Sequence, residues 1–491
     1  MATLLAGCFL AAGLSLLLPS EPSYDPWAWL VWGREIPLLK LDTTGGPSWK
    51  PLTVVITTVF APLTEVSDSL PPALWLVVSR AFGLLALVLA FRLAARLAGP
   101  PRWAEIVAGL VAATALALSP QWLRYLMHGN EAPMAVALML WGVERHFDGH
   151  RQQALLLGIL ACLVRPEVFP FVAVYALFLW RAEPGFRLKL AGLMALLPLL
   201  WLVPEWIGSG NPLDAGRQAT SEPSWSLSLA DRPWEAALER AHRLTTLQLE
   251  LAALAAVAFA IRARDKTILV FAGVAVLWLC LYVGMTQAGF SGSPRYLLPT
   301  IVLVCLLTGV GVVRIIQLAA TLVGRVRFPR AAVAGGLAAA ALLVLGAWPY
   351  LDARQDDLRR QADTAEELAE LHGDLEEAVA AAGGRDAVNR LGQPAVNRAF
   401  HTHLAWALHV PIRTIELGHG QALVFDANTT LSAPAPIKKR IPTRDVIARV
   451  GAWEVYKAGR LRPSSAAGGQ GGAVKAPAPV RGAQPDGGSG D

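Results

Sequence analysis

Long apolar runs alternate with short polar segments through the first 349 residues of the chain. A membrane-spanning helix needs about 20 mainly apolar residues, within a range of about 17 to 25. On that rule we expect about eleven transmembrane helices. The predicted spans are residues 3–19, 72–98, 104–119, 132–146, 152–166, 168–181, 188–207, 245–262, 267–285, 296–317 and 331–349. The pattern therefore predicts an all-α polytopic membrane domain over residues 1–349.

The hydrophobic pattern changes after Trp348. Residues 355–382 have the periodicity of an amphipathic helix. Short β-like runs, such as 422–425 and 452–456, then follow between Gly and Pro residues. We expect residues 350–460 to form a small α/β domain. Residues 461–491 are rich in Gly, Ala, Pro and Ser, which predicts a disordered tail.

The composition supports a membrane protein. The chain is 54% hydrophobic and only 16% charged, whereas a soluble domain carries about 25% charged residues. The net charge of +6 does not indicate nucleic-acid binding, because the Arg and Lys residues cluster between apolar runs. The four Cys residues lie inside apolar runs without metal-ligand spacing, which favours a packing role.

The basic residues predict the orientation. Loops around residues 92–102, 145–151, 181–189, 262–266 and 314–330 are rich in Arg and Lys, and they alternate with poorer loops. Basic loops face the cytoplasm, so we expect a multi-pass protein of the cytoplasmic membrane with a cytoplasmic N-terminus. The loops 20–71, 120–131, 208–244 and 286–295 and the C-terminal domain would then be extracytoplasmic.

Charged residues gather in the outer loops. An ionisable side chain at the centre of a span costs about 2.5–3.5 kcal/mol, so charges at span ends are candidate functional residues. The candidates are Asp25, Lys50, Glu131, Arg165, Glu167 and Arg295. Two interpretations are open. Each charge could have a local partner (Arg165 with Glu167, Arg124 with Glu131) and the nearby indoles could form an interfacial belt. Alternatively, all of them converge on one ligand.

The residue types favour an anionic amphiphile as that ligand. Arg and Lys suit a phosphate group, and carboxylates suit proton transfer or sugar hydroxyls. The segment 24–52 also carries Trp29, Trp32 and Trp49, and indoles suit a sugar face or an acyl chain.

Five motifs, taken in chain order, resemble the GT-C superfamily of membrane glycosyltransferases, which use polyprenyl-phosphate sugars as donors. They are Asp25 after the first span, Trp49-Lys50-Pro51-Leu52, Gly129-Asn130-Glu131, Leu163-Val164-Arg165-Pro166-Glu167, and Arg295-Tyr296-Leu297-Leu298-Pro299. The chain departs from the commoner family pattern by having one Asp in place of an acidic pair and one Pro after Lys50. The resemblance covers roughly residues 1–320 and is greatest to mannosyl- and arabinosyltransferase-like members of actinobacterial type.

The resemblance implies a GT-C-like fold and an inverting glycosyltransferase acting at the outer face of the membrane, in cell-envelope glycan assembly. Asp25 would be the general base. Lys50, Arg165 and Arg295 would bind the donor phosphate. Sugar and acceptor contacts would come from Tyr24, Trp29, Trp32, Trp49, Glu131, Glu167 and Tyr296. The implied partners are a polyprenyl-phosphate-linked sugar, the lipid bilayer and a glycan, lipid or protein acceptor. No cofactor is expected, although the outward carboxylates would suit a divalent metal.

Two other functions are open. A lipid-linked sugar transporter or flippase would show internal repeats and charges near the membrane midplane, whereas this chain shows no repeat and places its charges at one face. A non-catalytic scaffold for envelope assembly would lack convergence of Asp25, Lys50 and Arg165. In the C-terminal domain, His401-Thr402-His403 could bind zinc, but a packing role is favoured. We expect that domain to engage the acceptor or to cover the site.

Overall fold

The computed structural model describes residues 1–491 except 222–225, 325–328, 418–422, 428–444 and 458–491, and its side chains are described outside 324–332. Residues 1–458 form one compact unit. The tail expected over residues 461–491 lies outside the described residues.

Every predicted span corresponds to a helix. The helices of this part are α1 (Ala2–Leu14), α2 (Tyr24–Glu35), α3 (Pro51–Phe60), α4 (Leu70–Ala98), α5 (Arg102–Ala117), α6 (Trp122–Met127), α7 (Ala132–Phe147), α8 (Arg151–Val164), α9 (Phe169–Ala182), α10 (Arg187–Ser209), α11 (Asp214–Ala219), α12 (Pro233–Thr245), α13 (Leu247–Ala263), α14 (Lys266–Gln287), α15 (Leu298–Gly324) and α16 (Pro329–Ala381). Short 3₁₀ helices connect them: η1 (Ser15–Leu17), η2 (Ala61–Glu65), η3 (Pro166–Val168), η4 (Pro184–Phe186), η5 (Leu227–Leu229) and η6 (Pro294–Leu297).

Fewer helices than the predicted number are long enough to cross a bilayer alone. In the described part of the chain, five helices meet the length and hydropathy requirement, and a sixth span results if α12 and α13, bent by 88°, are counted together. Ala2–Leu17, Pro51–Glu65 and Arg151–Val164 are apolar but shorter. The number of about eleven spans and the orientation of the termini stay predictions.

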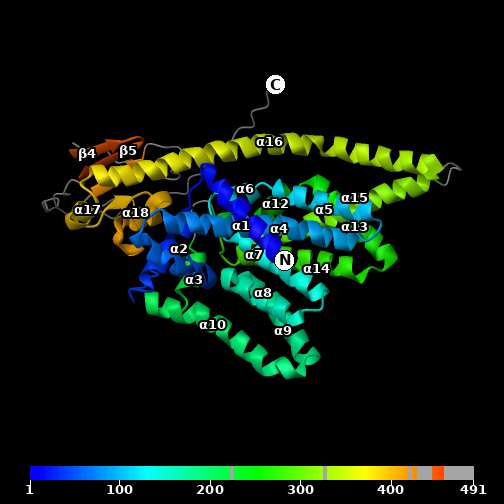
Figure 1. The fold of residues 1–491 in the computed structure, drawn as a ribbon, viewed down its shortest axis with the longest axis horizontal. Coiled ribbons are helices and arrows are strands. Elements are labelled where there is room, and N and C mark those ends of the chain that lie inside the picture. The colour runs from blue at the N-terminus through cyan, green and yellow to red at the C-terminus, as the bar shows by residue number, and fades with distance from the viewer. Residues whose placement is uncertain (222–225, 325–328, 418–422, 428–444, 458–491) are drawn as a thin grey trace, which may run out of the picture. The chain divides into compact units, whose positions relative to one another are not determined.

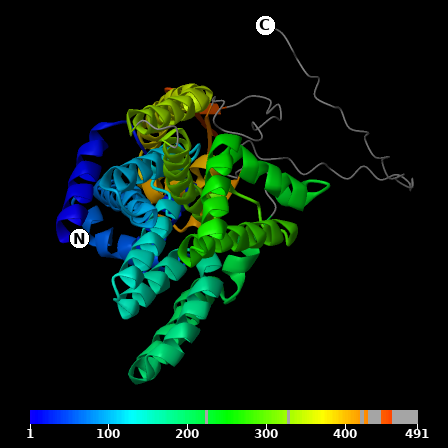
Figure 2. The same ribbon diagram turned by 90° about the vertical axis from the view of Figure 1, so that its right-hand side faces the viewer.

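The centre of the helical part is packed through small residues. Helix α4 packs against α1, α5, α7 and α15, and α15 also packs against α13 and α16. Ala86, Ala90, Ala94 and Ala108 are fully buried in this core, because small side chains let helix backbones approach closely. Figure 1 and Figure 2 show α8, α9 and α10 lying on one side of this centre, with α16 on the opposite side.

Helix α16 corrects one expectation. The sequence suggested a span over 331–349 and a separate amphipathic helix over 355–382, but one helix runs from Pro329 to Ala381 and continues through Pro349. The change in composition marks a change of environment along the helix. Its first part packs on α15 and its last part packs on strands β4 and β5 (Figure 1).

The C-terminal region is α/β, as expected. After α16 come α17 (Arg385–Leu391), β1 (Ala395–Val396), η7 (Arg398–Phe400), α18 (His401–Leu408), η8 (Ile412–Thr414), β2 (Glu416–Leu417), β3 (Leu423–Ala427), β4 (Asp445–Val450) and β5 (Trp453–Lys457). The sheet order is β2-β1-β3-β5-β4. Strand β1 is parallel to β2 and β3, whereas β5 is antiparallel to β3 and β4. The β-like runs recognised in the sequence correspond to β3 and β5.

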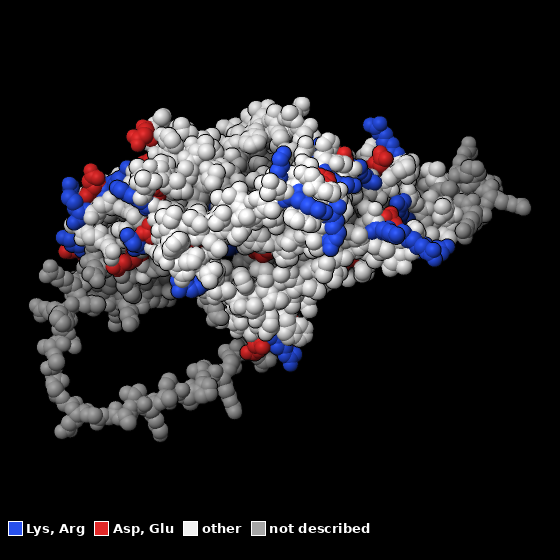
Figure 3. All heavy atoms as spheres, turned by 90° about the horizontal axis from the view of Figure 1, so that it is seen from below, with Lys and Arg blue, Asp and Glu red and all other residues white. Residues whose placement is uncertain are grey.

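Charged side chains are unevenly distributed over the surface. In the face shown in Figure 3, broad areas carry neither Lys and Arg nor Asp and Glu, and the charged side chains lie in separate groups rather than evenly over the face. Large hydrophobic side chains are exposed on α10, α13 and α14, including Leu199, Leu254, Val270 and Leu277. This distribution is what a bilayer requires of a lipid-facing surface.

The close packing of α15 gives a test of the helical core. A Cβ atom at Gly311 would overlap the backbone carbonyl of Ala252 on α13, whereas one at Gly273 on α14 would meet no atom within 4 Å. We expect Gly311→Ala to destabilise the protein by about 1–3 kcal/mol through overpacking. Gly273→Ala should be neutral or stabilising, because Ala is the better helix former. Thermal unfolding in detergent measures both, and equal midpoints would contradict the packing of α13 on α15.

Candidate active site

Proline residues place the predicted charges at helix starts. Proline is favoured at the first helical position, because its fixed φ suits a helix and its missing N–H needs no partner there. Pro51 starts α3 and Pro166 starts η3, so Lys50 and Arg165 become the capping residues before them, both with extended backbone. Glu131 also directly precedes a helix, α7, but its backbone is helical and Pro133 stands at the second helical position. The charged motifs of the sequence are therefore charged helix N-termini.

The first half of the site joins Asp25, Lys50, Glu131 and Arg295. Asp25 lies in the first turn of α2. Arg295, from η6, donates to Asp25 Oδ2 over 2.5 Å. The Nζ atom of Lys50 lies 3.7 Å from the same oxygen and also donates to Glu131 Oε1. Segments far apart in the chain thus meet through direct ion pairs.

The second half extends from Glu131 through Arg165. The Nη1 atom of Arg165 donates to Glu131 Oε1 and its Nη2 atom donates to Glu167 Oε1, both over 2.9 Å. The Arg165 guanidinium lies 4.8 Å from the centre of the Tyr296 ring, and that of Arg295 lies 5.8 Å from it. The aromatic face therefore adds a cation–π contact to each arginine.

The network is electrically balanced and opens at one end. Its cations, Lys50, Arg165 and Arg295, face as many carboxylates, Asp25, Glu131 and Glu167. The exposed fraction of the side chain is 0% at Glu131, 14% at Asp25 and 24% at Arg295. A substrate can therefore reach the network from the Asp25–Arg295 end.

Glu131 is the most deeply buried member. Burial alone would raise the pKa of its carboxyl group, but Lys50, Arg295 and Arg165 outweigh burial and hold the pKa below its ordinary value. The carboxylate therefore stays ionised at physiological pH and keeps the cations in place.

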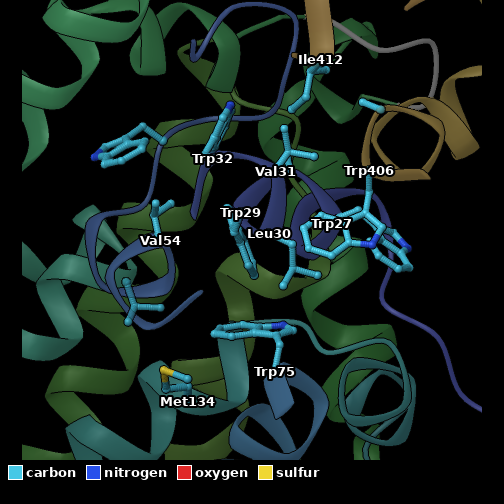
Figure 4. Close-up of a cluster of buried hydrophobic side chains, with 14 of the residues drawn as sticks. Trp27, Trp29, Leu30, Val31, Trp32, Val54, Trp75, Met134, Trp406 and Ile412 are labelled. Atoms are coloured by element: carbon cyan, nitrogen blue, oxygen red, sulfur yellow. The ribbon is translucent and has the colours of Figure 1, made fainter. Parts of the chain in front are cut away.

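The indoles predicted to bind sugar form the wall behind the network. Trp29 and Trp32 are fully buried, and Trp49 is 3% exposed. The Trp29 ring packs edge-on against Trp75 and lies under the Lys50 amine, while Trp32 packs against Trp49. Figure 4 shows Trp27, Trp29 and Trp32 on α2 and Trp75 on α4 in this cluster. In this structure Trp29 and Trp32 are covered by protein, and Trp29 contacts the network through the Lys50 amine.

Two tyrosines complete the surroundings. Tyr24, beside Asp25, stacks on His401 and its hydroxyl donates to the carbonyl of Gly45 over 3.4 Å. Tyr125, from α6, is buried within electrostatic range of Arg165 and Arg295, and sequence reasoning did not single it out. The local-pairing interpretation joined its neighbour Arg124 to Glu131, but Arg124 is exposed and Glu131 pairs with Lys50 and Arg165.

The C-terminal region packs on the helix that carries Asp25. The His403 ring stacks on Trp27 with ring centres 4.3 Å apart, and His401 Nε2 lies 2.9 Å from the carbonyl oxygen of Ile415. Both histidines are buried. In the part of the chain that the structure describes, no group of three His, Cys, Asp or Glu side chains is placed to hold a metal ion. The histidines of the His-Thr-His motif are packed side chains, His403 on an indole ring and His401 on a backbone carbonyl.

Comparison with known proteins identifies a shared fold. No family model and no curated protein matches the sequence. Among solved structures, ArnT from Cupriavidus metallidurans bound to undecaprenyl phosphate matches with a TM-score of 0.50 and 17% identity, over 96% of this chain and 99% of ArnT. The chain shares the fold of ArnT. The apo form of ArnT is similar with a TM-score of 0.48 and 16% identity, over 93% of this chain and 97% of that one.

Removing the charge of Glu131 should destabilise the protein. Glu131→Gln leaves Lys50 and Arg165 buried without a shared carboxylate, and breaking a buried pair in this way costs about 3–5 kcal/mol. Glu235→Gln is the matched control, because Glu235 pairs with Arg232 at the surface and exposed pairs contribute at most about 1 kcal/mol. Thermal unfolding in detergent should separate the two variants. Equal stabilities would show that Glu131 does not hold the network.

The packed histidines predict a pH dependence of the C-terminal region. Burial lowers the pKa of His401 and of His403 below the ordinary value. The folded rings are therefore neutral, and stability should be lost as the pH falls below about 6.5, where the unfolded histidines take up protons. Hydrogen exchange in α18, corrected for intrinsic rates, should rise between pH 7.5 and 5.5 while exchange in α4 does not. Replacing His403 by Phe should weaken this response, and an unchanged response would contradict it.

Proposed function

We propose that the chain is an inverting glycosyltransferase that moves a sugar from a polyprenyl-phosphate donor to an acceptor hydroxyl at the outer face of the cytoplasmic membrane, in cell-envelope glycan assembly. The observation that carries the proposal is the single ion-pair network of Asp25, Lys50, Glu131, Arg165, Glu167 and Arg295. The GT-C resemblance of the sequence and the fold shared with a protein that binds undecaprenyl phosphate support it.

The cations suit a phosphate leaving group. As the bond between the sugar and the phosphate breaks, the phosphate gains a second negative charge, and fixed positive groups stabilise the transition state. Arg295 and Lys50 meet at Asp25, at the open end of the network, and Arg165 lies deeper. Arg295 and Lys50 would therefore meet the donor phosphate first.

Asp25 suits the role of general base. The oxygen of the acceptor hydroxyl would attack the anomeric carbon, the sugar–phosphate bond would break, and Asp25 would accept the hydroxyl proton. One displacement inverts the configuration of the anomeric carbon. In the structure Asp25 is held by Arg295 and Lys50, so phosphate binding to these cations would free its carboxylate for the acceptor.

Glu131 and Glu167 suit orienting roles. The Oε2 atom of each has no hydrogen-bond partner among the described residues. The same holds for the Nε atom of Arg295. Sugar hydroxyls could donate to these oxygens, since a buried polar atom gains most when it finds a partner. No metal is required by this scheme.

Transfer of labelled sugar from polyprenyl-phosphate donors, in membranes containing equal amounts of each variant, tests the proposal. Asp25→Asn should reduce transfer by about 10² or more, the contribution expected of a general base. It should bind undecaprenyl phosphate as well as the wild type or better, because a carboxylate that competes for Arg295 and Lys50 is lost. Asp356→Asn is the control, because Asp356 is an exposed acid on α16.

The outcomes separate the alternatives. Equal transfer by Asp25→Asn and wild type would exclude Asp25 as the base. Absence of transfer from every donor, together with protein-dependent movement of a labelled lipid-linked sugar across vesicle membranes, would favour the transporter. Absence of both would favour the scaffold.

A further inference from the structure

Helix α18 contacts the helix turn that carries Asp25. The hydroxyl of Thr402 donates to the backbone carbonyl of Tyr24 over 2.8 Å. Tyr24 directly precedes Asp25, and Thr402 is fully buried. A hydrogen bond from a residue nearly 380 positions away thus fixes the peptide next to the proposed base.

Stacked rings lie on both sides of this hydrogen bond. His401 stacks on Tyr24 with ring centres 6.4 Å apart, and His403 stacks on Trp27. Three consecutive residues of α18 therefore contact Tyr24, directly before Asp25, or Trp27, two positions after it.

The first turn of α2 needs such support. The capping residue, Ser23, makes no side-chain hydrogen bond to the start of α2; its hydroxyl bonds to the carbonyl of His128 instead. An uncapped first turn frays easily, because its N–H groups lack partners. Thr402 is a donor and does not replace the missing cap; it anchors the turn through the carbonyl of Tyr24. The other end of α2 is also held, since Arg34 donates to the carbonyl of Trp406 over 3.2 Å.

We propose that Thr402 is a positioning residue for Asp25. Its hydrogen bond fixes the first turn of α2 and so directs the Asp25 carboxylate toward Arg295, Lys50 and the acceptor hydroxyl. The inference rests on the proposed function for the role of Asp25, and it assigns to the C-terminal region a direct part in the geometry of the reaction.

Kinetics of matched variants test the role. Thr402→Val keeps the shape but removes the donor, and Thr402→Ser keeps the donor. Thr308→Val is the control, because Thr308 is also buried and donates to a carbonyl, that of Leu249, on a neighbouring helix. We expect Thr402→Val to lower kcat about tenfold and to lower donor KM by no more than about fivefold, because the displaced base transfers the proton less well and competes less for Arg295 and Lys50.

The Ser variant and the control decide whether the effect is specific. Thr402→Ser should restore most of kcat, and Thr308→Val should leave kcat unchanged. Equal losses in Thr402→Val and Thr308→Val, or no loss in either, would overturn the positioning role while leaving the proposed function intact.

A double-mutant cycle tests the inference without transfer. The affinity for undecaprenyl phosphate is measured for wild type, Thr402→Val, Asp25→Asn and the double variant. If Thr402 acts through Asp25, Thr402→Val should tighten binding about two- to fivefold when Asp25 is present, because a displaced carboxylate competes less for Arg295 and Lys50. The same change should have no effect when Asp25 is replaced by Asn, because coupled residues are not additive. Additive effects, or no effect in the wild type, would overturn the inference. Failure of transfer with a coupled cycle would instead count against the proposed function alone.

Discussion

The buried carboxylate of Glu131 is the constraint on which the arrangement of the helix ends depends. A charge removed from water must be paired and hydrogen-bonded or it destabilises the fold. Glu131 meets this requirement by accepting from both Lys50 and Arg165, and those cations require further carboxylates in turn. The starts of α2, α3, α7 and α15 and the end of α8 must therefore meet at one level of the molecule.

The same constraint limits how a ligand could enter the ion-pair network. Every cation of the network already has a carboxylate partner. Under the proposed function, a donor phosphate would therefore have to exchange with a carboxylate, and Asp25, the most exposed of the acids, would have the lowest cost of exchange. The tryptophan cluster behind the network limits this rearrangement to the exposed end.

The sequence predicted much of the fold and most members of the site. Apolar runs locate helices because backbone groups in a membrane must bond within their own segment. The prolines after Lys50 and Arg165 fix helix starts locally, which is why those motifs could be recognised. The ion pairs between segments could not be predicted, because Glu131 and Lys50 are 81 positions apart and no local rule joins them. Tertiary packing likewise determines three features that no local rule predicts: the burial of Trp29, the continuation of α16 through Pro349 and the hydrogen bond from Thr402 to Tyr24.

The length of α16 has a geometric consequence. A helix of 53 residues extends about 80 Å at about 1.5 Å per residue, whereas the hydrocarbon layer of a bilayer is about 30 Å thick. One helix thus joins α15 to the C-terminal sheet. The indole N–H of Trp453, in β5, donates a hydrogen bond to the carbonyl of Leu371 in α16. The distance between α15 and the sheet is set by helix geometry rather than by a flexible linker. Under the proposed function, an acceptor bound to the sheet would be held at a fixed distance from the helical part, so acceptors would be selected by length as well as by chemistry.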